Sequence, residues 1–139
     1  MTWTVAFDVD FRAEFAAFDA EARKTIAAYA LVLASEGPQL GRPMADTFKG
    51  SKHASMKELR PTVNKVEWRV AYAFDVTRRA TVLAAASKGG RSSALVYKQT
   101  IATADARFTR HRANLVSSRT TQSASHTRSQ RSSRRTPRR

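Results

Sequence analysis

Cationic side chains in the middle of this sequence have the types and spacing that favour chemistry on an anion. Lys57 and Arg60 stand in "MKELR", Arg69 in "WRV" and Lys88 in "SKGG". An arginine fork binds two phosphate oxygens at once, and a lysine supplies a point charge. Tyr97, in "ALVY", adds a hydroxyl that could extend toward the region of Lys88. This set favours a protein that acts on a polyanion.

Each of these residues also has a purely structural interpretation. Arg69 could pair with Glu67 or Glu58 on a solvated face. Lys88 precedes two glycines, which is typical of an ordinary turn as well as of a close backbone approach to a ligand. Tyr97 has the spacing of a core aromatic on an amphipathic helix. The residue pattern alone leaves both interpretations open.

Composition narrows the classes of protein that this chain can represent. The sequence holds 25 Lys and Arg against 11 Asp and Glu, a net charge of +14. This balance disfavours acid catalysis by paired carboxylates and favours a polyanionic partner, although charge alone does not separate nucleic acid from a membrane surface. The absence of cysteine excludes disulfides and thiolate sites, and three widely spaced histidines do not suggest zinc. We therefore expect no metal and no cofactor.

The sequence also carries a prediction about location and domains. It shows neither a signal-peptide pattern nor a run approaching the ~20 apolar residues of a membrane span, so we expect a cytoplasmic protein without membrane contact. The segment 117–139 contains seven arginines, no acid and no large apolar residue. We expect it to be a disordered basic tail behind one folded domain, 1–116, which keeps a net charge of +7 without the tail.

Hydrophobic periodicity within 1–116 predicts an α+β fold. The segments expected as strands are 2–8, 56–60, 66–74 and 79–87, and those expected as helices are 11–18, 20–36 and a final helix after Ser92 or Ser93. Asp10 and Asp19 are the expected N-caps, and Gly37 is expected to end the second helix. The order β-α-α-β-β-β-α predicts a small antiparallel sheet with the two N-terminal helices on one face.

The strand 66–74 has two faces of different character. Trp68, Val70, Tyr72 and Phe74 share the face that should meet the helices, because side chains alternate along a strand. Arg69 falls on the other face beside small alanines. We expect that face to form a shallow open concavity in which Arg69 is accessible.

Three segments together resemble a known family. They are "GPQLGRPMADTFKGSKHASMKELR", "WRVAYAFD" and "SKGGRSSALVYKQTIATADARF". They look like toxins of the RelE/HigB superfamily from bacterial type II toxin–antitoxin pairs, and within it like the phage-derived HigB-like branch. The resemblance covers roughly residues 2 to 112 and implies the RelE-like fold.

The resemblance implies a metal-independent endoribonuclease that cleaves messenger RNA on the translating ribosome and thereby inhibits growth. In such enzymes the 2′-hydroxyl of the substrate is the nucleophile. The implied catalytic set is Arg69, Lys57, Arg60, Lys88 and Tyr97, with RNA contacts from Lys49, Lys52, His53 and Arg91. The implied partners are a cognate antitoxin of helix-turn-helix type, mRNA, the ribosome, and promoter DNA through the antitoxin complex.

Two other functions remain open from the sequence. One is a non-catalytic nucleic-acid-binding module of the same fold, because the aromatic and cations that relatives carry just before Tyr97 are replaced by "ALV" here. The other is a phage-derived interaction protein whose basic face docks an acidic partner.

Overall fold

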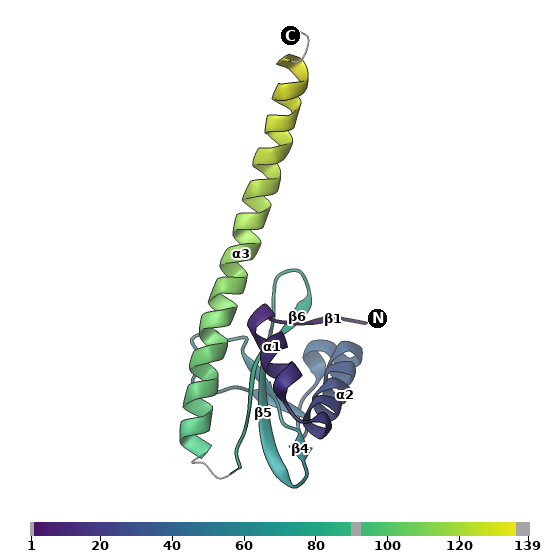
Figure 1. Cartoon of the computed structure of the whole chain (residues 1–139), viewed down its shortest axis with the longest axis vertical. Helices are drawn as coiled ribbons and strands as arrows, with labels where there is room; N and C mark the ends of the chain where they lie inside the picture. Colours follow the sequence, from purple (N-terminus) through teal and green to yellow (C-terminus); the bar gives the residue numbers. More distant parts are fainter. Residues whose placement is uncertain (1, 90–92, 136–139) are drawn as a thin grey trace. The chain divides into compact units, whose positions relative to one another are not determined.

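A mixed β-sheet forms the centre of the structure, a computed structural model that describes residues 2–89 and 93–135, with side chains described to residue 117. Its strands are β1 (Thr4–Phe7), β2 (Ala45–Thr47), β3 (Lys57–Leu59), β4 (Thr62–Val63), β5 (Val66–Phe74) and β6 (Arg79–Ser87). They lie in the order β1-β6-β5-β3-β2, and the short β4 pairs with β5. All described pairs are antiparallel except β1 with β6, which is parallel, so the predicted antiparallel sheet is corrected to a mixed one. Figure 1 shows β5 and β6 as the two long central strands.

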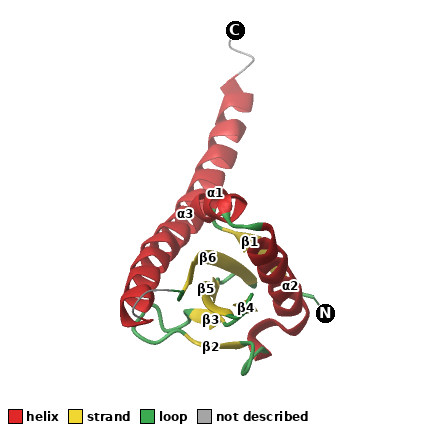
Figure 2. Cartoon of the chain, turned by 60° about the horizontal axis from the view of Figure 1, so that its bottom comes forward, coloured by secondary structure: helices red, strands yellow, loops and turns green. Residues whose placement is uncertain are grey.

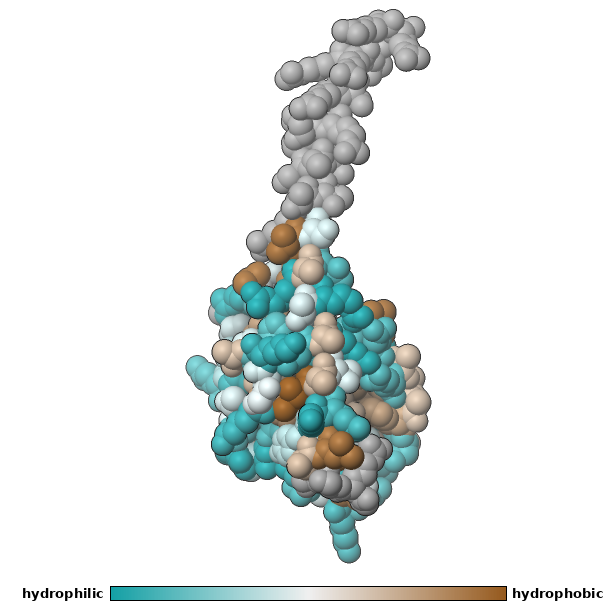
Figure 3. All heavy atoms as spheres, turned by 90° about the vertical axis from the view of Figure 1, so that its left-hand side faces the viewer, coloured by the Kyte–Doolittle hydropathy of each residue, from teal (hydrophilic) through white to brown (hydrophobic). Residues whose placement is uncertain are grey.

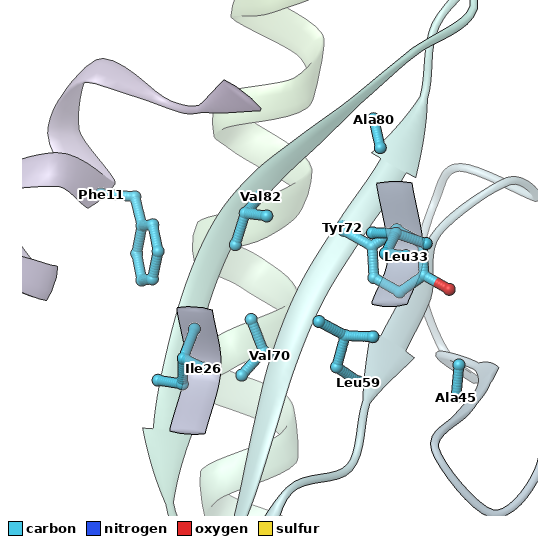
Figure 4. Packing of buried hydrophobic residues seen from close by; sticks show 9 residues of the cluster. All are labelled: Phe11, Ile26, Leu33, Ala45, Leu59, Val70, Tyr72, Ala80 and Val82. Atoms are coloured by element: carbon cyan, nitrogen blue, oxygen red, sulfur yellow. The ribbon is translucent and has the colours of Figure 1, made fainter. Parts of the chain in front are cut away.

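The helices α1 (Val9–Ala17) and α2 (Ala20–Glu36) cover one face of this sheet, and a short 3-10 turn, η1 (Gly37–Gln39), follows α2. Their side chains Phe11, Ile26 and Leu33 pack in one cluster with Val70 and Tyr72 of β5. Figure 4 shows these side chains meeting across the strands. The predicted apolar face of β5 and the two helices on it are confirmed, and so is the α+β fold class.

The third helix, α3 (Ser93–Arg135), packs its first four turns on the opposite face of the sheet. Ala104 and Phe108 of α3 join a second buried cluster with Ala71, Ala73 and Leu83. Figure 2 shows the strands enclosed between α2 and this part of α3. The prediction of an open concavity on this face is therefore wrong. Small alanines let a helix approach closely, so they form a packed layer and not an empty one.

Side chains at the ends of the helices explain where the helices begin and end. Asp8, and not the predicted Asp10, caps α1, because its carboxylate accepts hydrogen bonds from the backbone N–H of Asp10 and Phe11 at 3.0 and 3.3 Å. Asp19 caps α2 as predicted, through the N–H of Ala22 at 2.8 Å. Gly37 ends α2 with a φ of +64°, and any larger residue there would meet the indole of Trp3.

Arg107 anchors the first part of α3 to the rest of the fold. Its guanidinium donates to the backbone oxygen of Leu83 at 2.8 Å and to Glu14 of α1 at 2.5 Å, and it lies 3.8 Å from Asp8. The hydrogen bond to Glu14, together with the charge of that carboxylate, holds the pKa of Arg107 above its ordinary value. This contact fixes the helix that carries Tyr97.

The chain divides into two units, Met1–Phe108 and Thr109–Arg139. The sheet, α1 and α2 belong to the first unit, and the second is the continuation of α3 as helical backbone to Arg135. The predicted domain limit at 116 and the predicted disorder of 117–139 stay predictions. On the α3 side, the first unit presents mostly hydrophilic residues with isolated hydrophobic ones (Figure 3). Among the described residues, no helix has the length and apolar character needed to cross a membrane.

Candidate phosphate-binding groove

A groove of about 410 Å³ opens between the edge of the sheet and the start of α3. The residues that line it come from segments far apart in sequence: Arg42, Asp46, Thr47, Lys49, Glu58, Arg60, Arg69, Lys88 and Tyr97. Five of them are cations and two are carboxylates. The groove is therefore cationic, and its shape is held by β2, β3, β5, the end of β6 and α3 together.

Arg69 lies at the floor of this groove and is almost completely buried, with 2% of its surface exposed. Its Nε donates to the hydroxyl of Tyr97 at 2.7 Å, and its Nη1 donates to the backbone oxygen of Trp68 at 2.8 Å. Its Nη2 donates to Glu67 at 3.2 Å. The expectation that Arg69 stands accessible on an open face is wrong, because α3 brings Tyr97 over it.

Tyr97 takes part both in the core and in the groove, so the two interpretations of its position are not exclusive. Its ring packs edge-on against Phe48, with ring centres 5.4 Å apart. The same ring lies 5.1 Å from the ammonium of Lys88 and 5.8 Å from the guanidinium carbon of Arg69. The ring of Tyr97 thus lies beside two cations of the groove, and its hydroxyl is bonded to one of them.

Glu58 lines the groove, although the sequence had suggested it only as an ion-pair partner of Arg69. It is 3% exposed and shares its charge between two arginines. Oε2 accepts a hydrogen bond from Arg60, and Oε1 lies 3.7 Å from Nε of Arg69. The register pairs Glu58 with Ala71, so its side chain is on the same face of the sheet as Arg69. Alternation along β3 and β5 combined with the correct strand pairing would have identified it.

The outer side of Arg69 is closed by an exposed carboxylate. Glu67 has 56% of its side chain exposed and lies 3.9 Å from Nζ of Lys88. The hydrogen bond from Arg69, followed by the charge of Lys88, holds the pKa of Glu67 below its ordinary value. Both acidic partners considered for Arg69 from the sequence are therefore engaged in the structure.

Arg42, Asp46 and Thr47 also line the groove and were not predicted as site residues. Arg42 Nε donates to Asp46 at 2.9 Å, and the N–H of Thr47 donates to the other Asp46 oxygen at 2.8 Å. These contacts, the one from Thr47 first, lower the pKa of Asp46. The spacing of Arg42 and Asp46 in the sequence gave no signal for this contact, because the two residues lie in a turn and a strand and not on one helix face.

The predicted site residues divide into those inside and those outside the groove. Arg69, Arg60, Lys88, Tyr97 and Lys49 line it. Lys57 does not: it pairs with Tyr72, whose side chain packs under α2, so it lies on the other face of β3. The cause is the alternation of side chains along β3, which puts Lys57 and Glu58 on opposite faces of the sheet.

The loop after β2 carries the remaining predicted RNA contacts. Lys52 and His53 are not among the residues that line the groove. The backbone N–H of Lys52 donates to Asp105 of α3 at 2.9 Å, and the ring of His53 packs edge-on against Phe108 at 4.9 Å. Arg91 lies outside the described residues. Within the described part of the chain, no group of three or more His, Asp or Glu side chains is arranged to hold a metal ion.

The groove can bind a phosphate through several donors and offers hydroxyl and carboxylate groups for proton transfer.

A family model described as "Phage derived protein Gp49-like (DUF891)" matches residues 13–109. HigB2 of Mycobacterium tuberculosis strain H37Rv, named as a toxin, is 44% identical over 94 residues, which are 67% of this chain and 46% of that protein. HigB3 of the same strain, also named as a toxin, is 37% identical over 76 residues, covering 55% and 65%.

This chain spans less than two thirds of the length of either relative. Among solved structures, a mutant of the E. coli toxin RelE in the free state aligns with a TM-score of 0.51 and 13% identity, covering 73% of this chain and 96% of that one. At this identity the likeness shows the fold alone. The predicted resemblance to the RelE/HigB superfamily is confirmed. The chain belongs to the phage-derived Gp49-like family, and its fold is the α+β fold of RelE.

Proposed function

We propose that this chain is the toxin of a type II toxin–antitoxin system and an endoribonuclease that cleaves messenger RNA on the translating ribosome. The observation that carries the proposal is the groove in which Arg60, Arg69, Lys88 and Tyr97 converge. The toxin names of the two mycobacterial relatives support the biological role. The net charge of +14 supports a polyanionic partner.

In this reaction the 2′-oxygen of the RNA attacks the adjacent phosphorus, and the bond from phosphorus to the 5′-oxygen breaks. The 2′-hydroxyl loses its proton, the 5′-oxygen gains one, and a 2′,3′-cyclic phosphate remains. Negative charge grows on the non-bridging oxygens in the transition state. Preorganised cations in a partly dry groove stabilise that charge.

Arg69 is the proposed phosphate clamp. Three of its nitrogens are already fixed by Tyr97, Trp68 and Glu67, so little conformational entropy is lost when an anion binds. Only the contact to Glu67 involves an exposed partner. A phosphate oxygen therefore reaches Arg69 by replacing the carboxylate of Glu67.

Arg60 and Lys88 add charge on the two sides of this clamp, and Lys49 with Arg42 extends the cationic surface along the RNA backbone. Tyr97 orients the 2′-hydroxyl. Of the two carboxylates in the groove, Asp46 has 34% of its side chain exposed and Glu58 only 4%. Asp46 is therefore the carboxylate that meets the substrate directly and accepts the proton of the 2′-hydroxyl.

The proposed partners follow from membership of this class of toxin. A small helix-turn-helix antitoxin neutralises the chain, and the complex binds its own promoter DNA. The basic groove is the surface that an acidic partner segment would cover.

A second function is favoured by a specific observation. Each of three groove cations is paired with an acid inside the protein: Arg42 with Asp46, Arg60 with Glu58, and Lys88 with Glu67. Such internal pairing suits a non-catalytic nucleic-acid-binding module. That module would bind RNA and leave it intact.

Induced expression without an antitoxin, followed by primer extension on a translated message, separates the two functions. The endoribonuclease produces growth arrest and discrete cuts within translated regions. A binding module leaves the message intact even when expression of the protein is verified. This result would contradict the proposed cleavage.

A further inference from the structure

Nε of Arg69 lies between two acceptors and bonds to only one of them. It donates to the hydroxyl of Tyr97 at 2.7 Å. Oε1 of Glu58 lies 3.7 Å away, which is beyond hydrogen-bond distance. A small rotation of the guanidinium would exchange the first partner for the second.

The second acceptor is an unsatisfied buried atom. Oε1 of Glu58 is inaccessible to water and has no hydrogen-bond partner among the described residues. Native proteins seldom leave a buried carboxylate oxygen without a donor, because the desolvation of that oxygen is then uncompensated. The other oxygen, Oε2, is held by Arg60, so Glu58 cannot turn away to solve the problem. In the free protein, Oε1 of Glu58 can therefore accept one further hydrogen bond.

We propose that Glu58 is a positioning residue that takes over Nε of Arg69 when a ribose 2′-hydroxyl binds to Tyr97. The inference rests on the proposed function, since it assigns the order of events in the same groove. In the free protein the Tyr97 hydroxyl is engaged as an acceptor by Arg69. When Arg69 turns to Glu58, the Tyr97 hydroxyl can bond to the 2′-oxygen, which leaves the proton of the 2′-hydroxyl to Asp46, and Arg69 gains a carboxylate that fixes its planar fork.

This exchange ties the position of Arg69 to the sugar of the ligand. A ribonucleotide offers both the phosphate and the 2′-hydroxyl, whereas a deoxyribonucleotide offers the phosphate alone. Phosphate replaces Glu67 at Nη2 in both cases. The exchange at Nε requires the 2′-hydroxyl, so it discriminates RNA from DNA within the reactive groove.

The test follows the Nε–H resonance of Arg69 by NMR in the full chain. The probes are a nucleoside 3′-monophosphate, which carries a 2′-hydroxyl beside a phosphate and contains no bond to cleave, its 2′-deoxy analogue, and inorganic phosphate. We expect the ribonucleotide to shift the Nε–H resonance and the other two to leave it near its free position. An equal response to the deoxy analogue, or no response to the ribonucleotide at saturation, overturns the inference.

Two variants locate the new partner of Nε. Glu58→Gln offers one oxygen for two arginines, so the ribonucleotide response should be lost. The matched control Glu67→Gln removes the same charge next to the same arginine from the exposed side, and it should keep the response. A response that persists unchanged in Glu58→Gln contradicts the role of Glu58.

Tyr97→Phe gives an independent check that does not depend on how well Glu58→Gln folds. Without the Tyr97 hydroxyl, Nε should already bond to Glu58, and its resonance in the free variant should match the ribonucleotide-bound position of the unchanged protein. A resonance that instead remains at the free position overturns the exchange. All these readouts use ligands that cannot be cleaved. If the chain binds the ribonucleotide as described but cuts no message, the proposed cleavage fails and the inference stands.

Discussion

The hydroxyl of Tyr97 accepts a hydrogen bond from Nε of Arg69 at 2.7 Å, across 28 positions of sequence. This contact joins the central strand β5 to the start of α3 and places both residues in a groove with four more cations, of which Lys88 is one. The chemistry of the groove therefore depends on how α3 sits on the sheet, and not on β5 alone.

Replacing Arg69 tests the phosphate clamp. Arg69→Lys keeps the charge but loses the planar fork, so the nitrogen that meets the phosphate is no longer fixed by bonds to Tyr97 and Trp68. We expect RNA cleavage to fall by about a hundredfold or more, in line with the loss of one preorganised charge donor. The measurement is single-turnover cleavage at saturating RNA. Cleavage at the unchanged rate would show that Arg69 does not contact the phosphate.

Arg69→Ala should behave differently from what an open-face position predicts. Because Arg69 is buried, its removal takes the second arginine from Glu58 and leaves the backbone oxygen of Trp68 without its donor, at a cost of about 1–3 kcal/mol. We expect denaturant unfolding to show this loss of stability. A fully stable Arg69→Ala variant would contradict the buried ion pair.

Asp46→Asn tests the proposed proton acceptor. We expect the maximal cleavage rate to fall by about a hundredfold or more while RNA affinity is kept or increased, because an anion is lost from a cationic groove. The lowered pKa of Asp46 keeps it ionised well into the acid range, so its titration should not affect the rate between roughly pH 5 and 7. A fall in affinity with no fall in rate would assign Asp46 a structural role only.

Glu67→Gln tests the internal counter-ion at Lys88 and Arg69. The lowered pKa of Glu67 means that its carboxylate stabilises the fold above its unfolded value of 4.5, and that this contribution is lost as the pH falls through the lower folded value. The variant should melt slightly below the unchanged protein at neutral pH and equal to it in strong acid. The difference should be small, because the side chain is 56% exposed. A melting difference that grows toward acid would contradict this sign.

Asp105 links α3 to the loop that carries Lys49. Its carboxylate accepts hydrogen bonds from the Ser51 hydroxyl and from the N–H of Lys52. Asp105→Ala should release that loop and weaken RNA affinity several-fold, with a loss of about 1–3 kcal/mol in stability from the unpaired N–H and hydroxyl. Asp75→Ala, which removes the carboxylate that accepts from Thr77 in the turn between β5 and β6, is the matched control. It should lose stability without losing affinity, and an equal loss of affinity in both variants would contradict the role of Asp105.

Local pattern predicted much of this fold. The alternation of Trp68, Val70 and Tyr72 identified the face of β5 under α1 and α2, and Asp19 and Gly37 identified the ends of α2. Asp8 was missed as a cap because Asp10 has the same capping chemistry two positions later, and only the backbone geometry separates them. These are all interactions between residues near one another in sequence.

The errors concern contacts between distant segments. Arg69 and the alanines beside it were interpreted as an open face because nothing in β5 reports that α3 packs there. Glu58 was not assigned to the groove because its orientation depends on pairing with Ala71. The parallel pairing of β1 with β6 is equally non-local, since it joins the first and the last strand along the chain. Residue types predicted the chemistry of the groove, and tertiary packing determined which of them share it.

The ends of the cut RNA test the central claim most directly. The unchanged chain and Arg69→Lys are incubated with translating ribosomes, and the products are sequenced after end-group analysis. Attack by the 2′-oxygen predicts a 5′-hydroxyl on one fragment and a 2′,3′-cyclic or 3′-phosphate on the other, at sites that the Arg69→Lys reaction loses. Fragments with 5′-phosphate ends, or intact RNA with the unchanged chain, would contradict the account.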